Sequence, residues 1–349
     1  MRLAVVGGGI LGRLAALMAA DRGCEVSLFS RYPLEVPKGT SYAAGGMLAP
    51  IAEAAEGEIS VIEYAKESFS LWREILQKCN EKSHPTGFAT NGSLILAHAR
   101  DYPFFDDYFD RLRSALSMAG IRHDKAYKLL DGAGVNELEP KIASSFQKGL
   151  FFPNEGHLNP AGMMACLLAA LKESAVKIMP PGCYQPAAHK VYLDDDTVSD
   201  FDCVLDCRGY SGAADINDLR GVRGEALLVR CKEVHLSRPL RLLHPRYHLY
   251  IIPRPNNHFY LGATSHESSY DGPITVESTL ELLSALYSIN PAFGSAEVLE
   301  SYVGVRPAFP DNLPKMQDLG GLIRLNGLYR HGYLLAPCLV KKMLTALSL

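Results

Sequence analysis

The chain has 349 residues, of which 48% are hydrophobic and 21% charged, with 35 Lys and Arg against 38 Asp and Glu. This balance excludes a disordered chain, a coiled coil and a collagen-like repeat, and the formal charge of −3 does not indicate nucleic acid or an anionic membrane as a partner. The length suits two domains, or one large two-lobed unit, with an ample core.

The apolar runs of the sequence are too short to cross a bilayer. The longest, over residues 163–171, falls far short of the roughly 18 residues that a span needs. The N-terminal stretch resembles a secretory signal, but three consecutive glycines (7–9) and Arg13 interrupt it. None of the eight Cys forms a CxxC pair, and several lie in apolar segments. We therefore expect a cytoplasmic protein without structural disulfides or stable membrane association.

The N-terminal segment predicts a strand–helix–strand unit with parallel strands. Residues 2–6 are a short apolar run typical of a buried strand, residues 10–22 have helical spacing that Gly23 ends, and residues 25–29 form the second strand. Further helices are expected over residues 59–79 and 103–118.

The middle of the chain predicts one more helix and a hairpin. The helix covers residues 160–173, with Asn159 as its N-cap and Pro160 in its first turn. An acidic hairpin turn at residues 194–196 joins two short strands, and an apolar strand follows at residues 203–207.

Beyond residue 220 the pattern changes to apolar or alternating runs, as in an antiparallel or mixed sheet. These runs cover residues 224–231, 248–252, 258–263 and 300–305, with a helix over 276–286 among them. A strand at residues 322–325 and a helix at residues 335–347 close the chain. The order indicates an α/β protein, α+β overall, in which a Rossmann-like nucleotide-binding domain is built from discontinuous segments around an inserted second domain.

Residues 7–12 (GGGILG) fit the G-x-G-x-x-G fingerprint between a strand and a helix. Gly7 permits the tight turn, Gly9 lets backbone N–H groups approach a pyrophosphate, and Gly12 allows close packing of helix on strand. The helix N-terminus, with Ile10 and Leu11, supplies positive partial charge for the phosphates. The alternative is a glycine-rich turn that binds no ligand.

Ser30 stands at the end of the second strand, where the fingerprint expects Asp or Glu on the ribose hydroxyls. A neutral hydrogen bond contributes about 1 kcal/mol and a charged one about 1.5–3 kcal/mol, so Ser30 would hold the ribose more weakly. Arg31 follows it and would suit the 2′-phosphate of NADP. These positions by themselves leave both FAD and NADP open.

Four further blocks occur in order along nearly the whole chain. They are residues 40–50 (TSYAAGGMLAP), 250–254 (YIIPR) with 262–264 (GAT), 304–307 (GVRP) with Asp311 and Pro314, and 327–337 (GLYRHGYLLAP). Together they resemble the D-amino-acid oxidase superfamily, and most closely the glycine oxidases of thiamine biosynthesis. This resemblance implies FAD rather than NADP.

The resemblance also implies the domain layout and the cofactor contacts. The FAD-binding domain would comprise residues 1–50, 140–215 and 305–349, and the substrate-binding domain residues 51–139 and 216–304. Some relatives attach the flavin through a Cys in a later segment, but no Cys lies between Cys231 and Cys338, so non-covalent FAD is expected. Beside the fingerprint, the expected contacts are Ser30, Arg31, Thr40, Ser41, Ala44, Gly45, Gly46, Met47, Cys183, Gly209, Leu328, Tyr329, His331, Gly332, Tyr333 and Leu334.

Three residues are candidates for the substrate site by the same resemblance. Arg306 would clamp the substrate carboxylate in bidentate fashion, and Tyr250 would donate its hydroxyl to that carboxylate. Arg330 would lie near the substrate and the flavin. The alternatives are an interdomain salt bridge for Arg306, a core aromatic for Tyr250 and a pyrophosphate-side contact for Arg330.

The implied reaction is FAD-dependent oxidation of glycine or another small amino acid, by hydride transfer from Cα to flavin N5. It yields an imine, then 2-oxo acid and ammonia, with H2O2 formed from O2, and would serve thiazole assembly in thiamine biosynthesis. The alternatives are a D-amino-acid or sarcosine-type oxidase or a dehydrogenase with another acceptor, and a non-catalytic flavin-binding subunit. No metal site is expected, because His244 and His248 lack a third ligand, and a homo-oligomer stays open.

Overall fold

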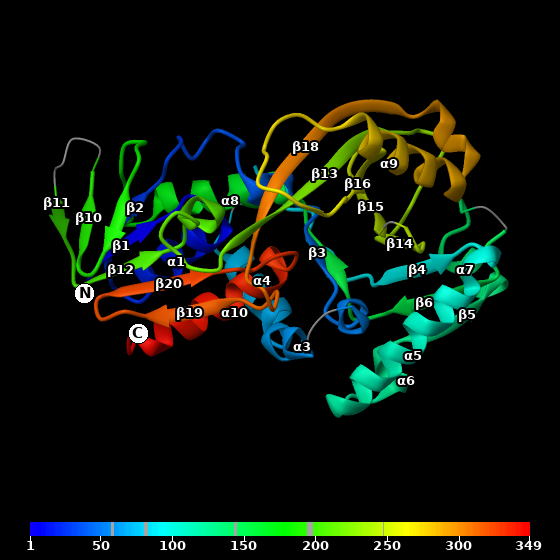
Figure 1. The fold of residues 1–349 in the computed structure, drawn as a ribbon, viewed down its shortest axis with the longest axis horizontal. Helices are drawn as coiled ribbons and strands as arrows, with labels where there is room; N and C mark the ends of the chain where they lie inside the picture. Colours follow the sequence, from blue (N-terminus) through cyan, green and yellow to red (C-terminus); the bar gives the residue numbers. More distant parts are fainter. Residues whose placement is uncertain (57–58, 80–82, 143–144, 194–197, 247) are drawn as a thin grey trace.

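The computed structural model describes residues 1–56, 59–79, 83–142, 145–193, 198–246 and 248–349. The acidic turn expected at residues 194–196 lies outside these ranges. Figure 1 shows two large sheets at opposite sides of the molecule, with both chain termini beside the smaller one.

The smaller sheet contains the strand–helix–strand unit expected at the N-terminus. Its six strands run in the order β19-β20-β12-β1-β2-β8, and all neighbours are parallel except β19 and β20. The strands are β1 (Arg2–Val6), β2 (Glu25–Phe29), β8 (Lys177–Ile178), β12 (Cys203–Asp206), β19 (Lys315–Asp318) and β20 (Leu322–Asn326).

Helices and a small sheet cover the two faces of this sheet, as buried parallel strands require. The helices α1 (Ile10–Ala20), α8 (Pro160–Glu173) and α10 (Gly332–Ala346) share one apolar core with it. Val191 of a three-stranded sheet packs with Phe29 and Val204 on the opposite face. That sheet consists of β9 (Gln185–Ala187), β10 (Lys190–Tyr192) and β11 (Val198–Asp200).

The second sheet has nine strands and is mixed, as expected. The order is β17-β13-β16-β15-β14-β4-β6-β5, with β18 also paired to β13, and only β14 and β4 run parallel. The strands are β4 (Ser93–Ala97), β5 (Lys128–Asp131), β6 (Lys148–Phe152), β13 (Arg220–Arg230), β14 (Leu240–Leu243), β15 (His248–Arg254), β16 (His258–Gly262), β17 (His266–Glu267) and β18 (Glu297–Ala308).

Helices α5 (Tyr102–Met118) and α9 (Val276–Ile289) pack on the nine-stranded sheet in two separate apolar clusters. A two-stranded ribbon of β3 (Met47–Leu48) and β7 (Gly156–His157) lies between the two large sheets (Figure 1). The remaining helices are α2 (Thr40–Ala43), α3 (Ser60–Ala65), α4 (Ser68–Gln77), α6 (His123–Ala126) and α7 (Gly132–Leu138), with short turns η1 (Ala52–Ala55), η2 (Ala99–Asp101), η3 (Gly209–Gly212) and η4 (Pro291–Ser295).

The structure corrects two local expectations. The single helix expected over residues 59–79 is two helices, α3 and α4, with a turn at residues 66–67. Both halves keep the same apolar spacing, so the pattern did not reveal the turn. Asn159 occupies the N-cap position of α8, but its side chain makes no capping hydrogen bond.

The expected domain boundaries remain a prediction, and two strands bear on them. β6, inside the range 140–215 expected for the FAD-binding domain, pairs with β4 and β5 in the nine-stranded sheet. β18 runs across the expected boundary at residue 305. All eight Cys carry free thiols. Among the residues that the structure places, no helix combines the length and apolar character needed to cross a membrane.

The packing at Gly12 predicts a severe effect of Gly12→Ala. A Cβ there would lie 1.7 Å from the carbonyl oxygen of Gly7, so the loop or the helix would have to move. We expect a loss of about 3 kcal/mol or more in the free energy of unfolding, measured by urea titration. The control is Gly120→Ala, where φ is +66° and the space is open, so only about 1–2 kcal/mol of backbone strain is expected. Equal losses in the two variants would contradict this account.

Candidate active site

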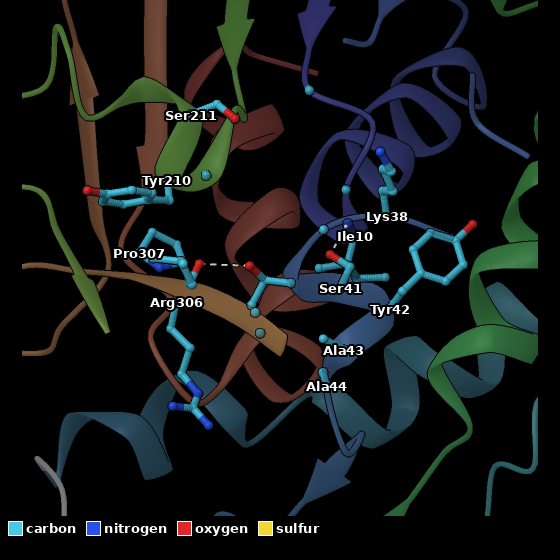
Figure 2. Close-up of a pocket in the computed structure, with 18 of the residues that line it drawn as sticks. Ile10, Lys38, Ser41, Tyr42, Ala43, Ala44, Tyr210, Ser211, Arg306 and Pro307 are labelled. Carbon is cyan, nitrogen blue, oxygen red and sulfur yellow. Dashed lines mark hydrogen bonds between the residues drawn. The ribbon is translucent and has the colours of Figure 1, made fainter. Parts of the chain in front are cut away.

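A cavity of about 1030 Å³ lies at the carboxyl ends of β1, β2 and β12 and continues to the inner strands of the nine-stranded sheet. Ligands of open α/β sheets bind outside the carboxyl ends of the parallel strands. Figure 2 shows Ile10 and Ser41 on one wall and Arg306 and Pro307 across from them. The cavity therefore joins the glycine-rich loop to the expected substrate residues.

The expected cofactor contacts line this cavity with three exceptions, which are Gly12, His331 and Leu334. Gly12 packs beneath the loop against Gly7. His331 is buried at the N-cap of α10, and Leu334 lies in the apolar core one turn further on. Tyr250, Arg306 and Arg330 all line the cavity. The contacts themselves remain a prediction.

The N-terminus of α1 presents backbone donors to the cavity. The N–H of Ile10 donates to Oγ of Ser41 at 3.0 Å, and Gly7 N–H donates to the carbonyl of Phe29 at 2.8 Å. The remaining N–H groups of the first helical turn have no intrahelical acceptor, as at every helix start. Such a terminus suits a pyrophosphate, and the open glycine loop fits this part of FAD.

The buried side chain of Arg13 hydrogen-bonds to this loop, a structural role that the sequence did not indicate. Its guanidinium donates to the carbonyls of Gly8 at 2.9 Å, Met164 at 2.7 Å and Leu34 at 2.6 Å. Burial lowers the pKa of Arg13. Carbonyl oxygens rather than carboxylates satisfy it, and no sequence motif indicates such an arrangement.

Arg306 lies on β18 opposite Val222 and points into the cavity (Figure 2). Its Nη1 donates to the carbonyl of Thr264 at 3.1 Å, and a Cβ on Gly224 would lie 2.2 Å from its Nη2. Glycine at position 224 therefore makes room for the guanidinium. No carboxylate among the described residues forms an ion pair with Arg306. A guanidinium in this situation can bind a carboxylate ligand in bidentate fashion.

Three tyrosines line the cavity beside Arg306. Tyr250 stacks on Tyr260 at 6.2 Å between ring centroids, and Tyr260 stacks on Tyr302 at 5.7 Å. Tyr260 donates its hydroxyl to the carbonyl of Ala43 at 2.5 Å, and burial raises its pKa. By contrast, the Tyr250 hydroxyl has no hydrogen-bond partner within the described part of the chain, which leaves it available to a ligand.

Unlike the guanidinium of Arg306, the guanidinium of Arg330 already contacts a carboxylate of the protein. Its Nη1 lies 3.7 Å from Oε2 of Glu56, while Arg241 contacts Glu53 at 2.9 Å and Glu56 at 3.1 Å. Burial alone would lower the pKa of Arg330, but the nearby Glu53 and Glu56 raise it. Glu53 also lines the cavity. Arg330 therefore reaches the cavity from within a shared ionic cluster that the sequence did not reveal.

Glu155, which directly precedes β7, links η1 to the two-stranded ribbon of β3 and β7 through hydrogen bonds. Its Oε1 accepts the N–H groups of Ile51 at 2.8 Å and Ala52 at 2.7 Å, and its Oε2 accepts the hydroxyl of Ser93. Complete burial raises the pKa of Glu155 from 4.5 to about 7, although these hydrogen bonds oppose the shift.

The shared ionic cluster predicts that Arg241→Met destabilises the protein. The variant removes the cation that Glu53 and Glu56 share, and breaking such a buried pair costs about 3–5 kcal/mol. The matched control is Arg111→Met, because the exposed pair of Arg111 with Asp107 contributes about 0–1 kcal/mol. Urea unfolding followed by fluorescence of the single, buried Trp72 measures both. Equal unfolding midpoints in the two variants would rule out a structural role for the cluster.

The raised pKa of Glu155 predicts a pH-dependent stability. Between pH 4.5 and about 7 the folded chain binds a proton there that the unfolded chain has lost, so stability falls as pH rises through this window. Relative to Glu155→Gln, the wild-type free energy of unfolding should fall by up to about 3 kcal/mol across it. Parallel profiles for the two proteins would show that the pKa of Glu155 is not raised.

Comparisons with known proteins agree with this architecture. The glycine oxidase of Geobacillus kaustophilus is 25% identical over 363 residues, covering 96% of this chain and 89% of the relative. The crystal structure of glycine oxidase from that organism matches with a TM-score of 0.82 at 22% identity, covering 99% of this chain and 94% of the other. Iminodiacetate oxidase from Chelativorans sp. BNC1 matches with a TM-score of 0.82 at 20% identity, over 97% and 93% of the two chains.

The whole sequence also matches at the family level. A Rhizobium etli protein provisionally named thiamine biosynthesis oxidoreductase ThiO is 38% identical over 339 residues, which cover 97% of this chain and 94% of the relative. The family described as DAO, FAD dependent oxidoreductase, matches residues 2–346. The resemblance seen in the four sequence blocks is confirmed, and this chain belongs to the DAO family of FAD-dependent oxidoreductases.

Proposed function

We propose that the protein oxidises glycine, or another small amino acid, to its imine with non-covalent FAD and O2. The observation that carries this proposal is the pairing of Arg306 with Tyr250 in one cavity, both free of protein carboxylates among the described residues. A guanidinium and a phenol hydroxyl are the groups that hold a carboxylate. The same cavity reaches the glycine-rich helix start, where a pyrophosphate would bind.

The residues of this chain bind and orient the substrate, and bound FAD would supply the hydride acceptor for the Cα–H and a route for the electrons to O2. Arg306 and Tyr250 would fix the carboxylate and so direct Cα toward the segment of Gly45 to Met47. Because the neutral amine releases electron density toward the imine, no side chain is required as a base. Hydrolysis of the imine then gives the 2-oxo acid and ammonia, while O2 accepts the two electrons taken from the substrate and becomes H2O2.

The positions and burial of the cysteines that line the cavity support non-covalent binding of FAD. Cys183 and Cys207 are the two cysteines among the described residues that line the cavity. Burial raises the pKa of Cys207 far above its usual range, which disfavours the nucleophilic thiolate. Cys183 lies on the side of Ser30 and Arg31, where Gly182 N–H donates to the Ser30 carbonyl at 3.1 Å. This is the expected adenosine end, away from Arg306.

The name of the Rhizobium etli relative connects the reaction to thiamine biosynthesis, where a glycine imine would feed thiazole assembly. The second candidate is a sarcosine-type or D-amino-acid oxidase or dehydrogenase, since the iminodiacetate oxidase shares the fold. A non-catalytic flavin-binding subunit is the third, and Ser30 in place of an acid is the feature that favours it.

The first experiment is the visible spectrum of the purified protein without oxygen, before and after addition of glycine. We expect oxidised flavin bands that bleach on mixing. Persistent bands with glycine that bleach with sarcosine, D-alanine or D-proline would support the second candidate. A protein that neither contains nor takes up FAD would contradict the proposal.

Arg306→Ala tests the carboxylate clamp. Loss of a charged, bidentate contact of about 3 kcal/mol should raise the apparent KM for glycine about 100-fold in steady-state kinetics. The control is Arg230→Ala on the neighbouring strand, whose partner Glu297 is exposed, and its KM should stay at the wild-type value. An unchanged KM in Arg306→Ala would remove Arg306 from the clamp.

A further inference from the structure

A second cavity has a volume of about 400 Å³ and shares no lining residue with the first one. Its walls include Arg254 from the end of β15, His157 from β7 and Asn159 at the start of α8. Cavities of about 300–1,000 Å³ are typical of small-molecule sites. The size therefore admits a small organic ligand, and the side chains decide its chemistry.

Arg254 is a half-buried cation with an incomplete set of partners. Its Nη2 donates to the carbonyl of Gly45 at 2.6 Å, its Nη1 lies 3.5 Å from the carbonyl of Pro253, and the guanidinium lies 5.8 Å from the ring centre of Tyr260. No carboxylate in the described ranges forms an ion pair with it. Burial lowers its pKa to about 10. Partial desolvation of a guanidinium without a counter-ion costs free energy, and a bound anion would offset this cost.

His157 adds a polar group without a partner. The side chain is 7% exposed, its Nδ1 is buried without a hydrogen bond, and no described residue hydrogen-bonds to either ring nitrogen. Burial and the neighbouring Arg254 lower its pKa to about 3, so the ring is neutral and offers one N–H donor. Buried polar groups normally have a partner, and one left without it calls for a ligand or water.

Asn159 is the third polar side chain of the cavity. It was expected to cap α8, yet it makes no capping hydrogen bond, and no other described residue pairs with its amide. Asn159 lines the cavity with Arg254 and His157. A guanidinium, an imidazole N–H and an amide NH₂ are all donors, and together they match the acceptor oxygens of an anion.

We infer that this second cavity binds a small organic anion through its carboxylate or phosphate group, with Arg254, His157 and Asn159 as the donors. The site is distinct from the substrate cavity, and it does not depend on the proposed function. It adjoins the first cavity through two contacts: Arg254 holds the carbonyl of Gly45, and His157 pairs with Met47 across β7 and β3.

Calorimetric titration of the full-length, flavin-saturated protein with orthophosphate and, separately, with acetate tests the site at constant ionic strength. At least one anion should bind saturably with one site per chain. Tighter orthophosphate binding would indicate a phosphate-bearing ligand, and tighter acetate binding a carboxylate. The absence of saturable binding by both anions would overturn the inference.

Substitutions of the proposed donors show whether the anion binds in the second cavity. His157→Phe and Asn159→Ala should each weaken it about tenfold, the loss of one hydrogen bond to a charged group. They avoid Arg254, whose removal would also release Gly45. The matched control is Asn154→Ala, since the exposed Asn154 donates to Lys125 outside the cavity and its loss should not change the affinity.

In Arg306→Ala, the binding that His157→Phe and Asn159→Ala weaken should keep its wild-type affinity, even if acetate also binds to Arg306 in the wild type. Loss of binding in Arg306→Ala would place the anion in the substrate cavity and overturn the inference. Wild-type affinity in both His157→Phe and Asn159→Ala would overturn it as well.

Discussion

The segment from Thr40 to Met47 is the part on which the rest of the site depends, because hydrogen bonds to helices that share a core with the six-stranded sheet and to strands of the nine-stranded sheet hold it in place. On one side, Oγ of Ser41 accepts the N–H of Ile10 at the start of α1, and Tyr333 donates to the carbonyl of Ser41. On the other, Thr40 donates to the carbonyl of Val305, and Tyr260 and Arg254 donate to the carbonyls of Ala43 and Gly45. One short stretch of chain thus sets the position of the nucleotide-binding loop relative to the substrate residues.

Five buried or half-buried arginines show how the same side chain acquires different roles from its partners. Arg13 is satisfied by three carbonyls and serves the fold, whereas Arg241 pairs with two carboxylates, one of which also pairs with Arg330. Arg306 and Arg254 have only carbonyl partners and no ion pair within the described residues, and each faces a cavity. A guanidinium retains its charge when buried, so an incomplete partner set indicates where an anion would bind.

Much of the fold was predictable because its signals are local. The strand, glycine loop and helix at residues 2–20 and the apolar runs of β13, β15, β16 and β18 depend on neighbouring residues and on period. The strands β4, β6 and β14 were missed, since their short apolar runs acquire their strand identity from pairing across distant parts of the chain. Asn159 has the residue type of an N-cap, but its side chain makes no capping hydrogen bond, and the residue lines the second cavity.

The sequence by itself determined the dinucleotide fingerprint, the four family blocks and hence the cofactor class, because these are patterns of residue types in a fixed order. It also singled out Tyr250, Arg306 and Arg330, which the fold brings to one cavity. Only the tertiary structure decided which of these side chains has no ion pair with another described residue and has room to bind a ligand. Arg330 shares carboxylates contributed by η1, and Arg306 has room because position 224 on another strand is glycine. The physical reason is that availability depends on the partners and space supplied by distant segments, whereas chemical type is set by the residue alone.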